Sequence, residues 1–371
     1  MPESTPDPGR IVSLDQFRGY TVLGMFLVNF VGSYAAIKAS LPLLAHHHTY
    51  CSYADTIMPQ FFFAVGFAYR LTFLRRWERD GPRAAWAHAI RRNLGLLLLG
   101  FVIHHLDGKY NSWAKLRELG LGGFLQTAFQ RSFFQTLTHI GVTSLWVLPV
   151  IAARPAIRIL YALFSAILFH YLSAEWGYYE WVLKRPGIDG GPLGFLTWTI
   201  PLLVGSLAYD AMTEGKPAVL RFVFWGAMLC LLGYALSCLG RVPTDLAGSD
   251  WRALLVEPPF VPPAEKVNIW TMSQRAGSVS YLTFGAGFSL VVFALFALAC
   301  DRGPVRIGLF RTLGTNALAG YIIHDLVNGA IKPLVPSDSP LWYVFTGCGL
   351  SLMICYLFLR YLEKRALFLK L

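Results

Sequence analysis

Charged residues are scarce in this sequence. Asp, Glu, Lys and Arg make up 14% of its 371 residues, whereas hydrophobic residues make up 55%. Because soluble globular domains carry about 25% charged residues, this composition excludes an ordinary soluble protein and indicates an integral membrane protein. We therefore expect the formal net charge of +11 to lie in membrane-flanking loops. The sequence has no basic low-complexity tail, so we predict no nucleic-acid partner.

Several motifs are also missing. The six cysteines form no CxxC pair, which argues against a zinc ribbon and a disulfide framework. Neither a GxxxxGK[ST] phosphate loop nor a GxSxG nucleophile elbow occurs, so an ATP-hydrolysing engine and an α/β-hydrolase have no support. The N-terminus lacks a basic start followed by an apolar core. We expect the first apolar run to be a membrane anchor and not a cleaved signal peptide.

Long apolar runs fill most of the chain. A helix needs about 20 mostly apolar residues to cross a bilayer core, and by this criterion there are about ten candidate spans. They centre on residues 19–37, 53–74, 87–106, 133–152, 156–173, 193–212, 218–239, 279–300, 307–329 and 341–362. No internal repeat or soluble domain is visible. The prediction is an all-α integral membrane protein, a bundle of about ten transmembrane helices forming one polytopic domain over residues 1–371.

Basic residues orient the predicted bundle. The strongest cationic cluster lies between the second and third spans and consists of Arg70, Arg75, Arg76, Arg79, Arg83, Arg91 and Arg92. The positive-inside rule places this cluster in the cytoplasm, which puts both termini on the cytoplasmic side as well. The loop before the second span then lies on the opposite side. We expect a multi-pass protein embedded in the lipid bilayer of a cell membrane, the inner membrane in a bacterium.

A run of three histidines marks that loop. His46, His47 and His48 stand in LLAHHHTYCSYADTIMPQFFF, where Asp55 opens the second span. Histidine is the commonest general acid or base near neutral pH, and a carboxylate at membrane depth needs a partner. A His–Asp pair would orient an imidazole and set its tautomer, as in many acyl-transfer sites. The alternative is that the imidazoles are simply solvated at the membrane interface.

Other polar residues lie inside the predicted spans. Asn29 is in the first run, where an unpaired amide would be costly. Asn316 and His324 are eight residues apart in the ninth run and so lie on one helix face to within a modest offset. Small residues such as Gly314 suit close helix packing there, and a site and packing can coexist. His139 is a further intramembrane candidate with the same two interpretations.

Metal and phosphate sites are the remaining possibilities. Adjacent histidines point about 100° apart on a helix, so a metal would need distant partners such as His104, His105 or His324. Nothing in the spacing requires one, and we predict no metal. The arginines after the second span either fix the topology alone or contact phosphates of a nucleotide-containing ligand.

Five blocks of the sequence, taken in order, point to one family. They are SLDQFRGYTVLGMFLVN, ADTIMPQFFFAVG, IDGGPLGFLTWTIP, KVNIWTMS and LGTNALAGYIIHDL. Together they resemble the multi-spanning acyltransferases related to heparan-α-glucosaminide N-acetyltransferase, nearly end to end. The resemblance implies a transferase that passes acetyl from cytoplasmic acetyl-CoA across the bilayer to an amine or hydroxyl of an extracytoplasmic sugar or glycan. It also suggests a homodimer.

The resemblance places a catalytic histidine just before the Asp-led span. We take it to be His47, with His46 as the alternative, because the spacing to Asp55 is about one residue shorter than the family's. Asp55 would orient the imidazole, and Asn29 or Asn316 would stabilise the oxyanion. The predicted acetyl-CoA contacts are Arg75, Arg76, Arg79, Asn316 and His324, and the predicted acceptor contacts are His48, Tyr50 and Lys266.

A proton-coupled secondary transporter of a small polar solute is the main alternative, because intramembrane His, Asp and Asn also suit such a carrier. Carriers commonly contain two related halves, and the first five runs do not repeat in the last five. The sequence leaves open whether the histidine acts as a general base or carries the acetyl group transiently. It also leaves open whether the acceptor atom is nitrogen or oxygen.

Overall fold

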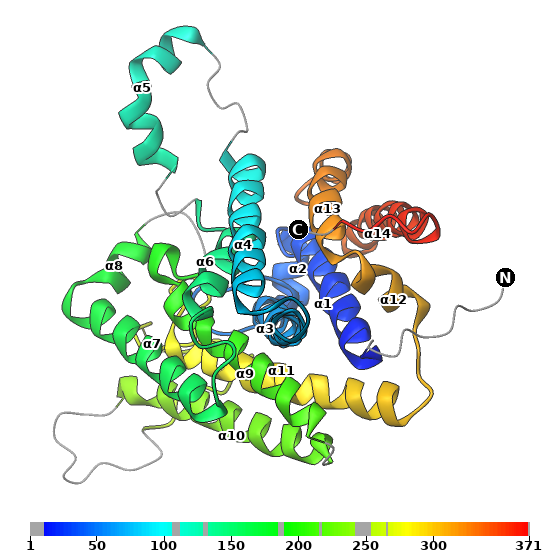
Figure 1. The fold of residues 1–371 in the computed structure, drawn as a ribbon. Coiled ribbons are helices and arrows are strands. Elements are labelled where there is room, and N and C mark those ends of the chain that lie inside the picture. The colour runs from blue at the N-terminus through cyan, green and yellow to red at the C-terminus, as the bar shows by residue number, and fades with distance from the viewer. Residues whose placement is uncertain are drawn as a thin grey trace. The chain divides into compact units, whose positions relative to one another are not determined.

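The computed structural model describes residues 11–105, 112–128, 133–184, 189–214, 217–241, 254–264 and 266–369, without the side chains of 104, 105 and 124–128. Throughout these residues the regular structure is helical and no strand is present (Figure 1). The prediction of an all-α protein is confirmed.

The helices of the described residues differ widely in length. The α-helices are α1 (Val12–Val31), α2 (Ala35–Ser40), α3 (Tyr53–Asp80), α4 (Pro82–His105), α5 (Trp113–Ala128), α6 (Thr136–Val147), α7 (Pro155–Glu175), α8 (Tyr178–Leu183), α9 (Phe195–Thr213), α10 (Ala218–Cys238), α11 (Val279–Phe296), α12 (Gly308–Thr315), α13 (Ala317–Ile331) and α14 (Leu341–Lys364). Short 3₁₀ segments occur at Pro42–Leu44, Gly191–Leu193, Leu239–Arg241 and Lys332–Leu334, and a π-helical turn, Ala297–Arg302, extends α11.

Six helices of the described chain are long and apolar enough to cross a membrane. They are Tyr53–Asp80, Pro155–Glu175, Gly191–Thr213, Ala218–Arg241, Val279–Arg302 and Leu341–Lys364. Each coincides with a predicted span, so the membrane-protein prediction is supported, although the count falls short of ten. The other four runs form α1, the arginine-bearing α4, the 12-residue α6 and a helix pair that is broken at Asn316. The cytoplasmic placement of the termini stays a prediction.

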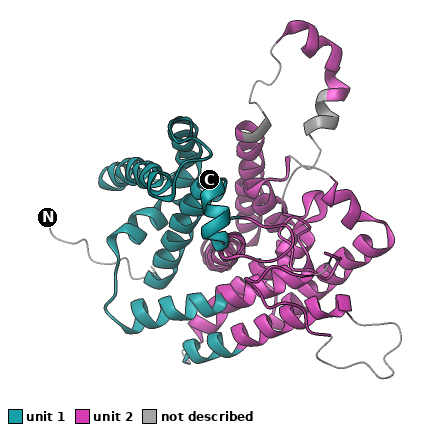
Figure 2. Cartoon of the chain, turned by 180° about the vertical axis from the view of Figure 1, so that it is seen from behind, with its two compact units in different colours: residues 1–45, 217–224, 290–370 teal, residues 46–216, 225–289, 371 magenta. Residues whose placement is uncertain are grey.

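The chain divides into two compact units (Figure 2). Unit 1 comprises Met1–Ala45, Pro217–Phe224 and Leu290–Lys370, and unit 2 comprises His46–Lys216 and Trp225–Ser289. The division passes through α10 and α11, so both units contain part of each of these helices. The predicted single domain over residues 1–371 remains a prediction.

Close contact between α3 and α9 forms the centre of unit 2. A Cβ atom added to Gly66 of α3 would lie 1.8 Å from the carbonyl oxygen of Leu202, and one added to Gly205 of α9 would lie 2.0 Å from that of Phe63. Only glycine allows two helix backbones to approach this closely. Helices α4 and α7 pack beside this pair, with α6 against α4 and α9. The α3–α9 contact fixes the helix whose first turn carries Asp55.

A similar glycine pair joins α1 and α12 in unit 1. A Cβ atom at Gly19 would lie 1.8 Å from the carbonyl oxygen of Phe310, and one at Gly314 would lie 2.1 Å from that of Asp15. Helix α14 packs against α12 and α13, and α1 also contacts α13. The packing interpretation of the small residues near Gly314 is therefore confirmed.

Candidate active site

The first turn of α3 holds a buried carboxylate. Ser52 caps the helix: its Oγ accepts a hydrogen bond from the Asp55 backbone N–H at 3.3 Å, and its own N–H donates to Asp55 Oδ2 at 2.9 Å. This reciprocal capping box satisfies backbone donors that a helix N-terminus otherwise leaves unpaired. The Ser52 hydroxyl also lies 2.8 Å from Asp55 Oδ2. Asp55 is fully buried, and the hydrogen bonds of the capping box hold its carboxylate at the start of α3.

His46 is the imidazole that meets this carboxylate. Its Nδ1 lies 2.9 Å from Asp55 Oδ1, and its side chain is 34% exposed whereas that of Asp55 is 0% exposed. Asp55 also accepts from three other donors, the backbone N–H groups of His47 and Ser52 and the Ser52 hydroxyl, so we assign the proton of the His46–Asp55 hydrogen bond to His46 Nδ1. The other ring nitrogen, Nε2, then carries the lone pair. The pair is therefore an imidazole base whose ring is oriented by a buried carboxylate.

The surroundings also set the charge of His46. Burial opposes the charged imidazole, but the hydrogen bond and charge of Asp55 outweigh it and raise the pKa of His46. Asp189 and Gln274 add smaller contributions in the same direction. The raised pKa makes the neutral His46 imidazole a stronger base than a free histidine side chain.

The other two histidines have different surroundings. The ring of His47 stacks on Tyr50, with ring centroids 4.3 Å apart, and its backbone N–H lies 3.4 Å from Asp55 Oδ2. Burial, followed by the nearby charge of Arg275, lowers the pKa of His48. Of the three imidazoles, the structure pairs His46 with Asp55, whereas the sequence favoured His47. Which of them is the catalyst stays a prediction.

Two further residues reach this site from distant parts of the chain. Asp189 is fully buried, and its Oδ1 accepts a hydrogen bond at 3.1 Å from Gln274 Nε2, itself 3% exposed. Gln274 also contributes to the raised pKa of His46. The sequence interpretation missed both residues. Their signal was the position of Asp189 at the head of the IDGGPLG block, where a carboxylate precedes two glycines.

Unit 1 contains a separate polar cluster that joins two predicted site residues. Asn29 Nδ2 lies 3.2 Å from His324 Nε2, and His324 Nδ1 lies 2.6 Å from the carbonyl oxygen of Tyr321. Lys332 Nζ donates to the Asn29 carbonyl oxygen at 2.8 Å. The ring of His324 also stacks on Phe26, with centroids 5.2 Å apart. Asn29 and His324, an amide and an imidazole of two predicted spans, are thus paired with each other.

Asn316, in contrast, does not bond His324. It stands at the break between α12 and α13, where its Nδ2 donates to the Leu367 carbonyl oxygen at 3.1 Å. Its Oδ1 accepts from the Leu369 N–H at 3.3 Å. The amide therefore ties the end of the chain to this break.

The arginines of the predicted donor site lie at the far end of α3 from Asp55. Arg75 follows Asp55 by twenty residues of one helix, which corresponds to about 30 Å, the thickness of a bilayer core. Arg79 bonds Asp80 at 2.8 Å, and Arg76 lies 3.8 Å from the same carboxylate. The helix thus separates the acid–base pair from the cationic cluster by one membrane thickness.

A second buried ionic cluster lies within unit 2. Asp210 of α9 accepts a hydrogen bond at 2.8 Å from Arg70 Nε and another from Arg158, which is fully buried. Arg158 also donates to Ser206 Oγ at 2.7 Å. The sequence interpretation counted Arg70 as a loop charge and passed over the other two. Opposite charges inside three predicted spans were the signal, because such charges must pair.

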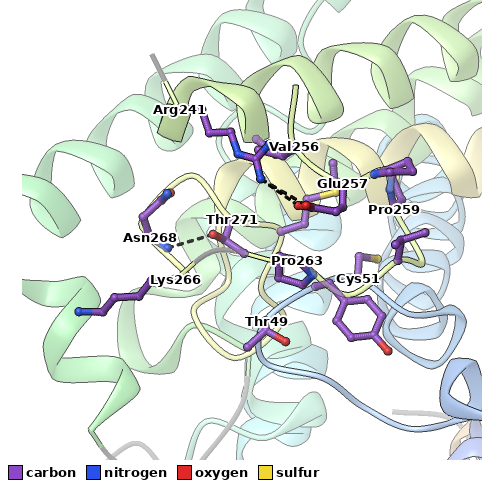
Figure 3. A pocket seen from close by; sticks show the side chains of 15 residues that line it. Thr49, Cys51, Arg241, Val256, Glu257, Pro259, Pro263, Lys266, Asn268 and Thr271 are labelled. Carbon is purple, nitrogen blue, oxygen red and sulfur yellow. Dashed lines mark hydrogen bonds and ion pairs between the residues drawn. The ribbon is translucent and has the colours of Figure 1, made fainter. Parts of the chain in front are cut away.

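A small cavity of about 50 Å³ lies beside the histidine loop (Figure 3). It is lined by Thr49, Tyr50, Cys51, Ser237, Arg241, Val256, Glu257, Pro258, Pro259, Val261, Pro263, Lys266, Asn268, Thr271 and Met272. Arg241 and Glu257 form an ion pair at 3.2 Å across it, whereas Lys266 extends away from that pair. Two predicted acceptor contacts, Tyr50 and Lys266, therefore share one cavity.

The described residues contain no group of three His, Cys, Asp or Glu side chains arranged to hold a metal ion. The side chains of His104 and His105, considered above as metal partners, lie outside the described residues. All six cysteines are free thiols.

The histidine loop and α3 lie within the part of the chain that matches a known family. Residues 10–185 match the family model described as heparan-alpha-glucosaminide N-acetyltransferase, catalytic. No curated protein matches the chain significantly. The match covers the His46–Asp55 pair and the α3 arginines, so this part of the chain is similar to the catalytic region of an acetyltransferase family. The match supports a resemblance of residues 10–185 to the heparan-alpha-glucosaminide N-acetyltransferase family.

Proposed function

We propose that this protein transfers an acetyl group from cytoplasmic acetyl-CoA to an amine or hydroxyl of a sugar on the opposite side of the membrane. The hydrogen bond between His46 and Asp55 carries the proposal, because it provides an oriented base at the edge of a buried polar site. The family match supports the reaction class, and the six candidate spans support a membrane setting.

In the proposed reaction, His46 Nε2 takes the proton of the acceptor as the acceptor attacks the thioester carbonyl carbon. The same proton then passes to the leaving sulfur as the carbon–sulfur bond breaks, which yields free CoA thiol. Asp55 holds the ring and stabilises the imidazolium formed between the two steps. Transient acetylation of the imidazole is the alternative route, and Asp55 would orient the ring in either case.

The layout of α3 gives the proposal its direction. Arg75, Arg76 and Arg79 would bind the phosphates of acetyl-CoA at the cytoplasmic end, where Arg76 and Arg79 would exchange their contacts with Asp80 for the phosphates. The acid–base pair lies about 30 Å away along the same helix, at the end assigned to the opposite face. Asn29, Asn316 and His324 remain predicted contributors to donor binding or oxyanion stabilisation.

The acceptor side would use the cavity next to the histidine loop. Tyr50 offers an aromatic surface, and Thr49 and Asn268 offer hydroxyl and amide groups of the kind that recognise a hydroxylated sugar. Lys266, which also lines the cavity, and His48 remain predicted acceptor contacts. The cavity is small, so only part of a sugar would enter it.

The test is thiol release from acetyl-CoA by the purified full-length protein in lipid nanodiscs, with and without glucosamine. We expect glucosamine-dependent release. We also expect His46→Ala to lose about a hundredfold or more of kcat, because general base catalysis contributes 10²–10⁴-fold. His47→Ala serves as the matched comparison and should keep most of the activity. Thiol release that survives His46→Ala but not His47→Ala would transfer the catalytic role to His47, and no release with any amino or hydroxyl sugar would overturn the function.

A further inference from the structure

Asp189 carries an oxygen atom that the fold leaves without a partner. Its Oδ1 accepts the Gln274 side chain at 3.1 Å, but its Oδ2 is buried and has no hydrogen-bond partner among the described residues. A buried polar atom of this kind costs free energy unless a ligand or a reacting group supplies the missing partner. The position of Asp189 beside the His46–Asp55 pair suggests which group that is.

The backbone holds Asp189 in place at a conformational cost. Its φ of 71° lies in the left-handed region, which non-glycine residues rarely adopt. The Asp189 N–H donates to the Gln274 carbonyl oxygen at 3.1 Å, and Trp198 Nε1 donates to the Asp189 carbonyl oxygen at 2.9 Å. Gly190 and Gly277 lie so close that a Cβ on Gly277 would be 2.8 Å from the Gly190 Cα. The carboxyl group is therefore fixed from both sides.

Several groups surround Asp189 and determine its charge. Burial is the main cause that raises the pKa of Asp189, and the charge of nearby Asp55 acts in the same direction; against the opposing effects of Gln274 and His46, the resulting pKa is about 7. The buried ring of His139, on α6, lies near the backbone here, because a Cβ on Gly194 would meet both His139 and the Asp189 carbonyl oxygen. A carboxyl group in this setting is protonated in part of the population at neutral pH and can then donate a hydrogen bond.

We propose that Asp189, as a neutral carboxylic acid, donates a hydrogen bond from Oδ2 to the oxyanion that forms on the thioester carbonyl. The inference rests on the proposed acetyl transfer. The two predicted oxyanion donors, Asn29 and Asn316, belong to unit 1, where their amides are already bonded. A buried acid kept neutral by its surroundings is an effective donor of this kind.

The acceptor lone pair forms a bond to the carbonyl carbon, the π pair moves to the oxygen, and His46 Nε2 takes the acceptor proton. Asp189 Oδ2–H donates to the resulting oxyanion and keeps its own proton. When the carbonyl reforms, the carbon–sulfur bond breaks and the thiolate takes the proton from His46. Asp189 is therefore protonated at the end of the cycle, as it was at the start.

The test compares Asp189→Asn and Asp189→Ala in the thiol-release assay between pH 5.5 and 9. An asparagine can keep an oxygen toward Gln274 and an N–H in place of the proposed O–H. We expect Asp189→Asn to stay within about tenfold of the unsubstituted protein at pH 7 and to lose the decline in kcat above that pH. Asp189→Ala should reduce kcat by about 10²–10³-fold, as removal of an oxyanion donor does, with little change in KM for acetyl-CoA.

Asp338→Asn, at an exposed carboxylate, is the matched control and should leave kcat and its pH dependence unchanged. The proposal is overturned if Asp189→Asn is as inactive as Asp189→Ala, because the negative charge would then be what matters. It is also overturned if Asp189→Ala retains full kcat, or if the unsubstituted protein shows no decline above pH 7. Should Asp189→Ala fail to fold, the comparison of Asp189→Asn with the unsubstituted profile decides. Loss of glucosamine-dependent release from every form would instead contradict the acetyltransferase function itself.

Discussion

Replacing Asp55 by asparagine should inactivate the protein by changing the tautomer of His46. Asp55 Oδ2 accepts from Ser52 N at 2.9 Å and Ser52 Oγ at 2.8 Å, whereas Oδ1 faces His46 Nδ1 at 2.9 Å. An asparagine would keep its oxygen at the Oδ2 position, where the N-terminal cap supplies the donors. Its NH₂ group would then face His46 and force Nδ1 to become the acceptor. The proton would move to Nε2, which could no longer act as the base.

The expected loss is about 10³-fold in kcat, since the same change in a catalytic triad costs about 10⁴. That loss corresponds to about 4 kcal/mol of transition-state stabilisation. The fold should survive, because the capping hydrogen bonds of Ser52 remain possible. The assay is thiol release from acetyl-CoA with glucosamine, together with thermal unfolding followed by fluorescence.

The pH dependence gives an independent check. Asp55 raises the pKa of His46, so kcat/KM should fall as the pH drops through a value above the usual 6.5 or so of histidine. In Asp55→Asn the remaining activity should extend to lower pH, because the neighbouring charge is lost. A variant with unchanged kcat, or with an acid limb that does not move, would refute the assigned pairing of His46 with Asp55.

Further predictions follow from the packing and the ion pairs. Gly66→Ala should destabilise the protein, since its Cβ would lie 1.8 Å from a backbone oxygen. The control is Gly349→Ala on α14, where a Cβ would have nothing within 4 Å, and it should leave the melting temperature equal or higher. Equal effects of the two substitutions on the melting temperature would contradict the α3–α9 contact. Asp210→Ala should cost about 3–5 kcal/mol of stability by leaving Arg70 and Arg158 without their shared carboxylate, and an unchanged melting temperature would refute this. Asn316→Ala should speed carboxypeptidase trimming of the C-terminal residues relative to Asn328→Ala, and identical rates would show that Asn316 does not hold that segment. The pKa of His46 is higher in the folded state than in the unfolded chain, so the His46–Asp55 pair should stabilise the fold fully below about pH 6.5. That stabilisation should disappear as the pH rises through the pKa of the folded state. If the stability difference between the unsubstituted protein and His46→Ala does not shrink with rising pH, the prediction is contradicted.

The helical class and the membrane setting follow directly from the sequence. Runs of about 20 apolar residues can satisfy their backbone groups only as helices in lipid, whatever their neighbours are. Six of the ten predicted runs meet the length and composition of a span. The ninth run could not be predicted correctly from hydropathy, because the break at Asn316 depends on hydrogen bonds to residues some fifty positions later.

The candidate site, like the fold, was predictable from the sequence only in part. The sequence alone determined that a histidine of the loop and Asp55 are the acid–base candidates, because a carboxylate at the start of an apolar helix requires a nearby partner. It could not choose among three adjacent imidazoles, since that choice depends on how the loop enters the Ser52 cap, and tertiary structure placed His46 against Asp55. It also gave no reason to connect Asp189 and Gln274 with this loop. Their hydrogen bond joins segments 85 residues apart, and only the packed helices bring such segments together. Local composition sets which helices form, whereas the pairing of polar groups inside them is a long-range property of the folded chain.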